Sequence, residues 1–173
     1  MPSIGIVLIS VIAAVFYGIV HDQITARICL EYFTIGHPPI FGTQDPTLLG
    51  LGWGIVATWW VGMLLGIPLA SVSRAGRRPK RSVTSLLLPV GKLLVVMGIG
   101  AAIAGIVGGS LASVGAVFLI GPIAEAVPHD RHVPFLINLW VHSASYLIGL
   151  IGGTILIAVV WRSRNQPLAL RKV

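Results

Sequence analysis

The chain has few charged residues and almost no cysteine for its length. Of its 173 residues only 10% are charged and only five are acidic, whereas 55% are hydrophobic. The mean hydropathy is correspondingly high, at +0.94. So little polar surface cannot cover a soluble globule, and the composition predicts an integral membrane protein. The one cysteine, Cys29, excludes an intrachain disulfide and any CxxC redox or zinc–thiolate motif.

Recognised catalytic motifs are also missing. The sequence has no nucleophile elbow, no P-loop and no GxGxxG followed by an acidic residue. Whether the protein is an enzyme is therefore left open. The net charge of +7 does not point to nucleic acid, because the basic residues flank apolar runs, where they orient a membrane protein and meet anionic head groups. The expected partner is the lipid bilayer, and no nucleic acid is expected.

Four apolar runs are long enough to cross a bilayer, which takes roughly 20 residues in a helix. They cover residues 4–20, 48–72, 86–112 and 135–161. No Lys or Arg precedes the first run and no clear cleavage site follows it, so we interpret it as a retained helix rather than a signal peptide. The pattern predicts an all-α polytopic membrane protein, with residues 1–173 as a single transmembrane domain and the four helices in a bundle.

The charges are divided between the two sides of this predicted bundle. The acidic residues and the histidines fall in or near segments 21–47 and 113–134, whereas most Lys and Arg fall in segment 73–85 and in the C-terminal tail. Short loops rich in Lys and Arg stay in the cytoplasm. We therefore expect both termini to be cytoplasmic, with segments 21–47 and 113–134 forming an outer polar cap.

The first outer segment carries a recognisable pattern. The stretches HDQITAR at residues 21–27 and EYFTIGHP at residues 31–38 resemble a segment of small, uncharacterised four-span membrane proteins of bacteria. The likeness is specific over about residues 21–41. It implies a multi-pass protein of the bacterial inner (plasma) membrane and brings no activity or catalytic residue with it.

Imidazole and carboxylate side chains gather in the predicted cap. Their nitrogen and oxygen atoms are the usual ligands of zinc, copper and non-haem iron, so three or four that converge would form a metal site. The alternatives are a rim satisfied by water and head groups, and a site that handles protons or a small polar ligand. The candidate ligands are His21, Asp22, Glu31, His37, His129, Asp130, His132 and His142.

His142 stands apart because it lies inside a predicted span, where an ionisable side chain usually faces the bundle interior or a wet cavity. Asn138 and Tyr146 share its helix face, and Ser145 is adjacent. We predict that His142 forms the floor of an outward-opening pocket, with His21 or Asp22 on the wall and segment 129–132 at the rim. The alternative is a hydrogen-bonded contact between helices.

The first helix is expected to run past the membrane surface to about Phe33, because no helix breaker occurs before Gly36 and the two following prolines. Arg27 and Glu31 would then form an i,i+4 pair. A solvent-facing Cys29 would react with a maleimide from outside.

Three functional hypotheses follow. The first is a small membrane module whose cap binds a metal ion or a small polar ligand. The second is a non-catalytic subunit or assembly factor, or a homo-oligomer, for which small residues at four-residue spacing would supply partner surfaces, although packing within one bundle explains them more simply. The third, a proton-coupled transporter, needs the polar line through His142 to continue inward, and no acidic residue lies in the inner half.

Overall fold

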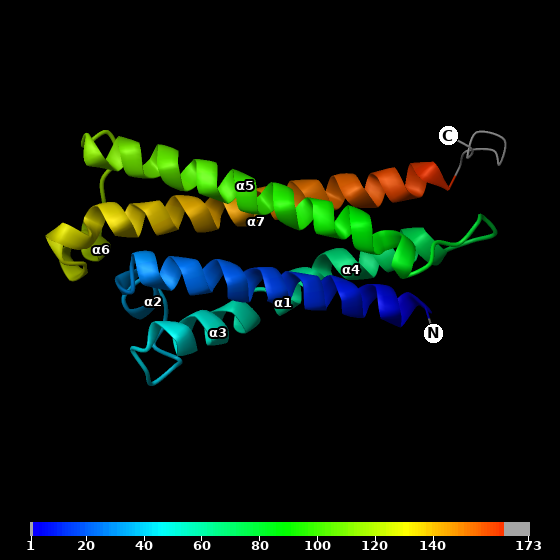
Figure 1. Ribbon diagram of the computed structural model, residues 1–173, viewed down its shortest axis with the longest axis horizontal. Coiled ribbons are helices and arrows are strands. Elements are labelled where there is room, and N and C mark those ends of the chain that lie inside the picture. The colour runs from blue at the N-terminus through cyan, green and yellow to red at the C-terminus, as the bar shows by residue number, and fades with distance from the viewer. Residues whose placement is uncertain (1, 165–173) are drawn as a thin grey trace.

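Four long helical segments lie side by side along one axis (Figure 1). In this computed structural model, which describes residues 2–164, every regular element is a helix. Each long segment has the length and apolar composition to cross a membrane. The segments are α1 (Pro2–Ile28), α3 (Pro46–Val56) continued by α4 (Trp59–Arg74), α5 (Thr84–Ser113) and α7 (His132–Ser163). The predicted all-helical chain with four membrane-length helices is confirmed.

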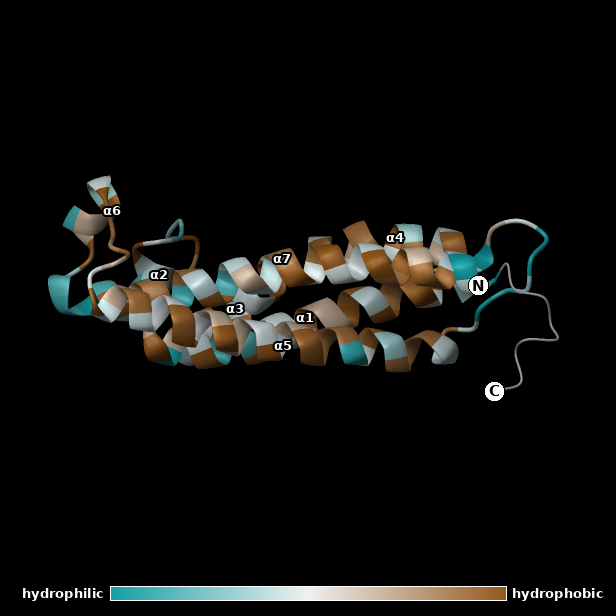
Figure 2. Cartoon of the chain, turned by 90° about the horizontal axis from the view of Figure 1, so that it is seen from above, coloured by the Kyte–Doolittle hydropathy of each residue, from teal (hydrophilic) through white to brown (hydrophobic). Residues whose placement is uncertain are grey.

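The two ends of the molecule differ in composition. At one end, called the cap end, lie the short elements α2 (Glu31–Thr34), α6 (Gly121–Ala126) and η1 (His129–Arg131). At the other, called the basic end, lie the start of α1, segment 75–83 and the end of α7 (Figure 1). Hydrophobic ribbon predominates along the helices, and the segment after α4 is hydrophilic (Figure 2). Of the predicted basic tail, Arg162 and Arg164 are described, and Arg164 donates to the Pro79 and Ala75 carbonyls of segment 75–83. Arg171 and Lys172 lie outside the described residues.

The helices pack as two hairpins, α1 with α3–α4 and α5 with α7, joined by contacts of α4 and α1 with the second hairpin. The first hairpin is very tight. A Cβ atom added at Gly54 would lie 2.6 Å from the Ile19 Cα, and one added at Gly18 would lie 2.5 Å from the Gly54 carbonyl oxygen. Such close approach between membrane helices requires residues without side chains.

The small residues at four-residue spacing also allow helices of this chain to pack closely against one another. Gly62 and Gly66 face the backbone and Ser10 side chain of α1, and Gly105 and Gly109 face Val141 and Ile137 of α7. Gly149 and Gly153 face Met97 and Leu65. Packing within one chain, the simpler interpretation of these residues, is confirmed. Gly105 also borders an open groove between α1 and α5.

The first helix ends earlier than predicted, at Ile28 rather than about Phe33. It does continue past Val20 without a break, but Cys29 and Leu30 turn the chain before α2 begins. The reason is capping of the helix end by side chains of α7 and η1. The Asn138 amide donates to the carbonyls of Thr25 and Cys29, and the Arg131 guanidinium donates to the carbonyl of Ile28. These donors satisfy carbonyls that another helical turn would otherwise cover.

The predicted Arg27–Glu31 pair is wrong for the same reason, because the turn moves Glu31 off the face that carries Arg27. Arg27 instead donates to Gln23 and Thr47, and Glu31 forms an ion pair of 3.0 Å with Arg131. The carboxylate therefore ties α2 to η1, which belong to different hairpins.

The second predicted span is broken near its middle, at Ala57 and Thr58, where α3 ends and α4 begins. The Thr58 hydroxyl donates back to the Gly54 carbonyl, and the Tyr146 hydroxyl donates to the Ala57 carbonyl at 3.3 Å. A break inside a membrane helix is tolerated where side chains satisfy the freed backbone groups.

We predict that Gly54→Ala lowers the free energy of unfolding in detergent by roughly 1–3 kcal/mol, because the added methyl group meets the α1 backbone and cannot be accommodated by a side-chain shift. Gly98→Ala, at a helical position with open space, is the matched control and should be neutral or stabilising by up to about 1 kcal/mol. Thermal melts of both variants test this, and equal melting temperatures would contradict the tight α1–α3 contact.

Candidate functional site

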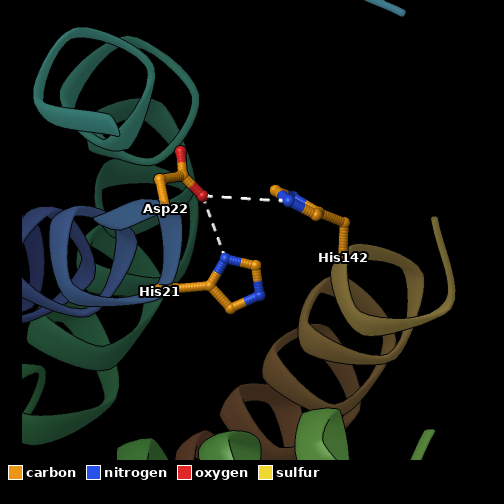
Figure 3. Close-up of side chains that lie close together, drawn as sticks. All are labelled: His21, Asp22 and His142. Carbon is orange, nitrogen blue, oxygen red and sulfur yellow. Dashed lines mark hydrogen bonds and ion pairs between the residues drawn. The ribbon is translucent and has the colours of Figure 1, made fainter. Parts of the chain in front are cut away.

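Three candidate ligands from distant parts of the chain converge between α1 and α7. His21 and Asp22 come from α1 and His142 from α7, and one ligand atom of each lies within 4.8 Å of the other two (Figure 3). The His21 Nδ1 and Asp22 Oδ1 atoms are 2.9 Å apart, and the His142 Nε2 atom is 4.0 Å from the same oxygen. The side chains are 10% exposed or less, so bulk solvent hardly reaches them.

A second buried contact sets the height at which these helices meet. Asn138 is fully buried and lies one turn before His142. Its amide donates hydrogen bonds to the Thr25 and Cys29 carbonyls at the end of α1. This places His142 beside the preceding turn of α1, which carries His21 and Asp22. Of the polar face predicted for the fourth span, Asn138 and His142 are buried at the helix contact, as is the adjacent Ser145, whereas Tyr146 is exposed.

One buried ring nitrogen of the cluster, the His21 Nε2 atom, has no hydrogen-bond partner among the described residues. The His142 Nε2 atom is 3.3 Å from the Thr25 hydroxyl, which itself donates to the His21 carbonyl. The His21 Nδ1 atom is hydrogen-bonded to the Asp22 carboxylate, whereas the His21 Nε2 atom is buried without a hydrogen-bond partner. Because buried polar atoms are normally satisfied, this nitrogen marks a place where a ligand is expected.

Aromatic rings close the site on the cap side. The Tyr32 ring stacks on His142 at 4.5 Å between centroids, and Phe33 lies 5.8 Å from the same ring. His37 packs in turn against Tyr32, Phe33 and Trp53. The segment that follows α1 therefore forms a roof over the cluster.

The cavity beside the cluster extends away from the cap. Its volume is about 60 Å³, room for a few water molecules. Besides His21, Asp22 and His142 it is lined by residues further from the cap end, among them Ala14, Val61, Met97 and Gly149. The predicted outward-opening pocket is therefore wrong in direction. The roof covers the cap side of His142, and the cavity lies on the side toward the basic end. Segment 129–132 does not line it.

A second cavity of about 80 Å³ shares lining residues with the first and continues toward the basic end. Its lining is apolar apart from Ser10, whose hydroxyl donates to the Ile6 carbonyl. Within the described residues this lining offers no titratable group, which counts against a proton path through the molecule.

The other candidate ligands lie outside the cluster. His37 sits in the roof with Nδ1 at 2.8 Å from the Tyr32 carbonyl oxygen, and Glu31 pairs with Arg131. His129 and Asp130 are exposed in η1. The His132 Nε2 atom lies near the Ala124 and Val127 carbonyl oxygens, where it holds α6.

Sequence reasoning did not find several residues that shape the site. Tyr17, which lines the cavity and lies 2.8 Å from Ser145 by its hydroxyl, is one helical turn before His21, and that i,i+4 spacing was an available signal. Thr58 lines the cavity at the helix break, near glycines that could have indicated an interruption. The roof depends on the turn after Ile28 and has no local signal.

Comparisons with known proteins add no relative: no family model matches the chain, and neither a curated protein nor a solved structure matches it. The function must be argued from the site.

The donor set suits a first-row transition metal. Two imidazoles and a carboxylate are the ligands of catalytic zinc sites that keep a fourth position open. Metal–ligand bonds of about 2.1 Å place ligand atoms about 3.4 Å apart, between the two separations seen here. Small side-chain shifts would therefore bring all three donors onto one ion.

The ion pair at the cap gives a pH-dependent prediction. Desolvation acts to raise the pKa of Glu31, but hydrogen bonds from its own backbone and from Arg131 outweigh it, so the pKa lies below the ordinary value of 4.5. The pair therefore stabilises the fold above pH 4.5, and this contribution is lost as the pH falls through the folded-state pKa. Glu31→Gln should cost at most about 1 kcal/mol at pH 7, since both side chains are partly exposed, and should cost nothing at low pH. Melting temperatures at the two pH values test this; an equal cost at both would contradict it.

Proposed function

We propose that the protein is an intramembrane metal-binding protein, with His21, Asp22 and His142 as ligands of one divalent transition metal ion. The observation that carries the proposal is the convergence of three donor atoms, on side chains that are 10% exposed or less, from two helices beside a small cavity. An ionisable cluster at membrane depth is costly to bury, and a bound cation would offset that cost.

Zinc is the ion we favour over copper or iron. A site of two imidazoles and one carboxylate holds zinc with three protein bonds, and here the fourth position would face the cavity and its few waters. Zinc lowers the pKa of a bound water to about 7, so an open position of this kind can generate hydroxide. The arrangement fits metal-assisted hydrolysis better than a purely structural site, whose four positions are filled by protein.

The first test is elemental analysis of protein purified without chelator. The native chain should carry zinc in a one-to-one ratio, and saturating zinc at 100 times its dissociation constant should stabilise the fold by about 2.7 kcal/mol. His142→Ala and Asp22→Asn should abolish both effects, because each removes a ligand.

His129→Ala is the matched control, because His129 is an exposed cap histidine outside the cluster. It should keep the zinc and the thermal shift. Retention of zinc by His142→Ala, or loss of it in His129→Ala, would place the metal elsewhere, and a native chain without metal would leave a hydrogen-bonded helix contact as the role of the cluster.

The orientation in the membrane is part of the same proposal: the basic end faces the cytoplasm of a bacterial inner membrane, and the cap end faces outward. The support is the distribution of charge, because Arg74, Arg77, Arg78, Lys80 and Arg81 cluster at the basic end and all acidic residues lie toward the cap end.

Cys29 cannot report this orientation, although the sequence suggested it as a probe. It is fully buried, and burial raises the pKa of its thiol to about 11, so the reactive thiolate is scarce at neutral pH. We predict no maleimide labelling of the native chain from either side. Gln44→Cys, in the exposed cap segment, should label from outside in intact cells, and Arg77→Cys only after the inner face is opened. The reverse pattern would invert the topology.

The two other hypotheses have less support. Most of the small residues that a partner subunit would need are packed against other helices of the chain, although Ala101 and Gly105 also border an open groove. A transporter would need a polar route beyond the cluster, and the second cavity is lined by apolar side chains and Ser10.

A further inference from the structure

A groove on the outside of the molecule leads from the bilayer to His21. It runs between α1 and α5, where Val20, Ile24 and Ile106 are exposed, and its volume is about 440 Å³. The floor is made of small residues of α5, including Gly98, Ala101, Ala102 and Gly105. In a membrane this groove would face lipid.

His21 is the residue shared by the groove and the cavity. Its side chain lines both, although it is only 9% exposed. Its Nδ1 atom faces Asp22, and the opposite ring nitrogen, Nε2, points away from the carboxylate and has no partner (Figure 3). Apart from Tyr17 and Thr25, the other groove residues are apolar. The Nε2 atom is itself buried, so a ligand in the groove reaches it only when the lining side chains move aside.

We infer that this groove holds an acyl chain of a membrane phospholipid, whose ester carbonyl oxygen accepts a hydrogen bond from the His21 Nε2–H group. The inference rests on the proposed function, because it takes His21 as a metal ligand, and it names a lipid partner of that residue. A metal ion on Nδ1 leaves the ring proton on Nε2, and a metal-bound histidine almost always donates that proton to an oxygen. Within the described residues the chain supplies no such oxygen.

The chemistry of the groove selects this occupant. Apolar walls at membrane depth fit a hydrocarbon chain, and they give no counter-charge for an ionic head group. The Nε2 atom lies about two turns before the end of α1, roughly 10 Å below Ile28, a depth that an ester group beneath a head group can reach.

The test uses a phosphatidylcholine with a photoactivatable group in its acyl chain, in nanodiscs with chelator-treated protein, so that docking is measured without metal. Cross-links should concentrate on residues 17–28 and 98–106 rather than on the exposed face of α7. Ala102→Trp fills the groove and should abolish the excess of cross-links on residues 17–28 and 98–106 over those on α7. Ile103→Trp is the matched control, because Ile103 is exposed on α5 but does not line the groove, and it should keep the excess.

A second measurement tests the hydrogen bond. With a phospholipid carrying ¹³C at the ester carbonyl, zinc should produce a down-shifted infrared band that chelator or Ala102→Trp removes. Cross-links spread evenly over the lipid-facing surface would show annular lipid only, and cross-links from the groove to a second copy would show a dimer contact; either overturns the inference. Zinc binding without groove labelling would refute this inference alone, whereas groove labelling in a chain that binds no zinc would refute the proposed function alone.

Discussion

The contact that the rest of the site depends on is the amide of Asn138 against the end of α1. Its two hydrogen bonds to the Thr25 and Cys29 carbonyls are fully buried and join helices from different hairpins. In an apolar environment each unsatisfied backbone group costs several kcal/mol, so the pairing has little freedom to slip. A slip of one residue along α7 would turn His142 away from Asp22. The position of the amide therefore determines whether a three-ligand cluster exists.

The same contact explains why the cap closes over the cluster. Because Asn138 and Arg131 satisfy the last carbonyls of α1, the helix can stop at Ile28 and the chain can turn back. The turn carries Tyr32 and Phe33 across the end of the helix and onto the His142 ring. The aromatic roof shields the cluster from the cap side, which leaves the cavity and the lipid-side groove as its neighbours. Helix termination, shielding and access thus share one physical cause.

The sequence predicted the helices well and the site only in part. Long apolar runs and the charge distribution were sufficient for four membrane-length helices, because each is a local property of composition. The position of His142 at a helix contact was also predictable, since an ionisable side chain inside a membrane span usually faces the bundle interior. What failed were statements that depend on contacts between helices: the end of α1, the Arg27–Glu31 pair, the break at Ala57 and Thr58, and the direction of the pocket. Each is decided by a side chain far away in sequence, such as Asn138, Arg131 or Tyr146, and periodicity within one helix carries no information about it.

The two nitrogens of His21 connect the proposed centre to its surroundings. Without metal, a neutral His21 that carries its proton on Nδ1 donates a hydrogen bond to Asp22, and Nε2 then holds a lone pair on the groove side of the ring. With a metal ion on Nδ1, the proton must move to Nε2, and the groove side of the ring changes from acceptor to donor. One imidazole between the cavity and a lipid-facing groove would therefore couple metal binding to the hydrogen bond that a lipid carbonyl can receive. By linkage, a ligand that accepts this bond would tighten the metal by the same factor that the metal tightens the ligand.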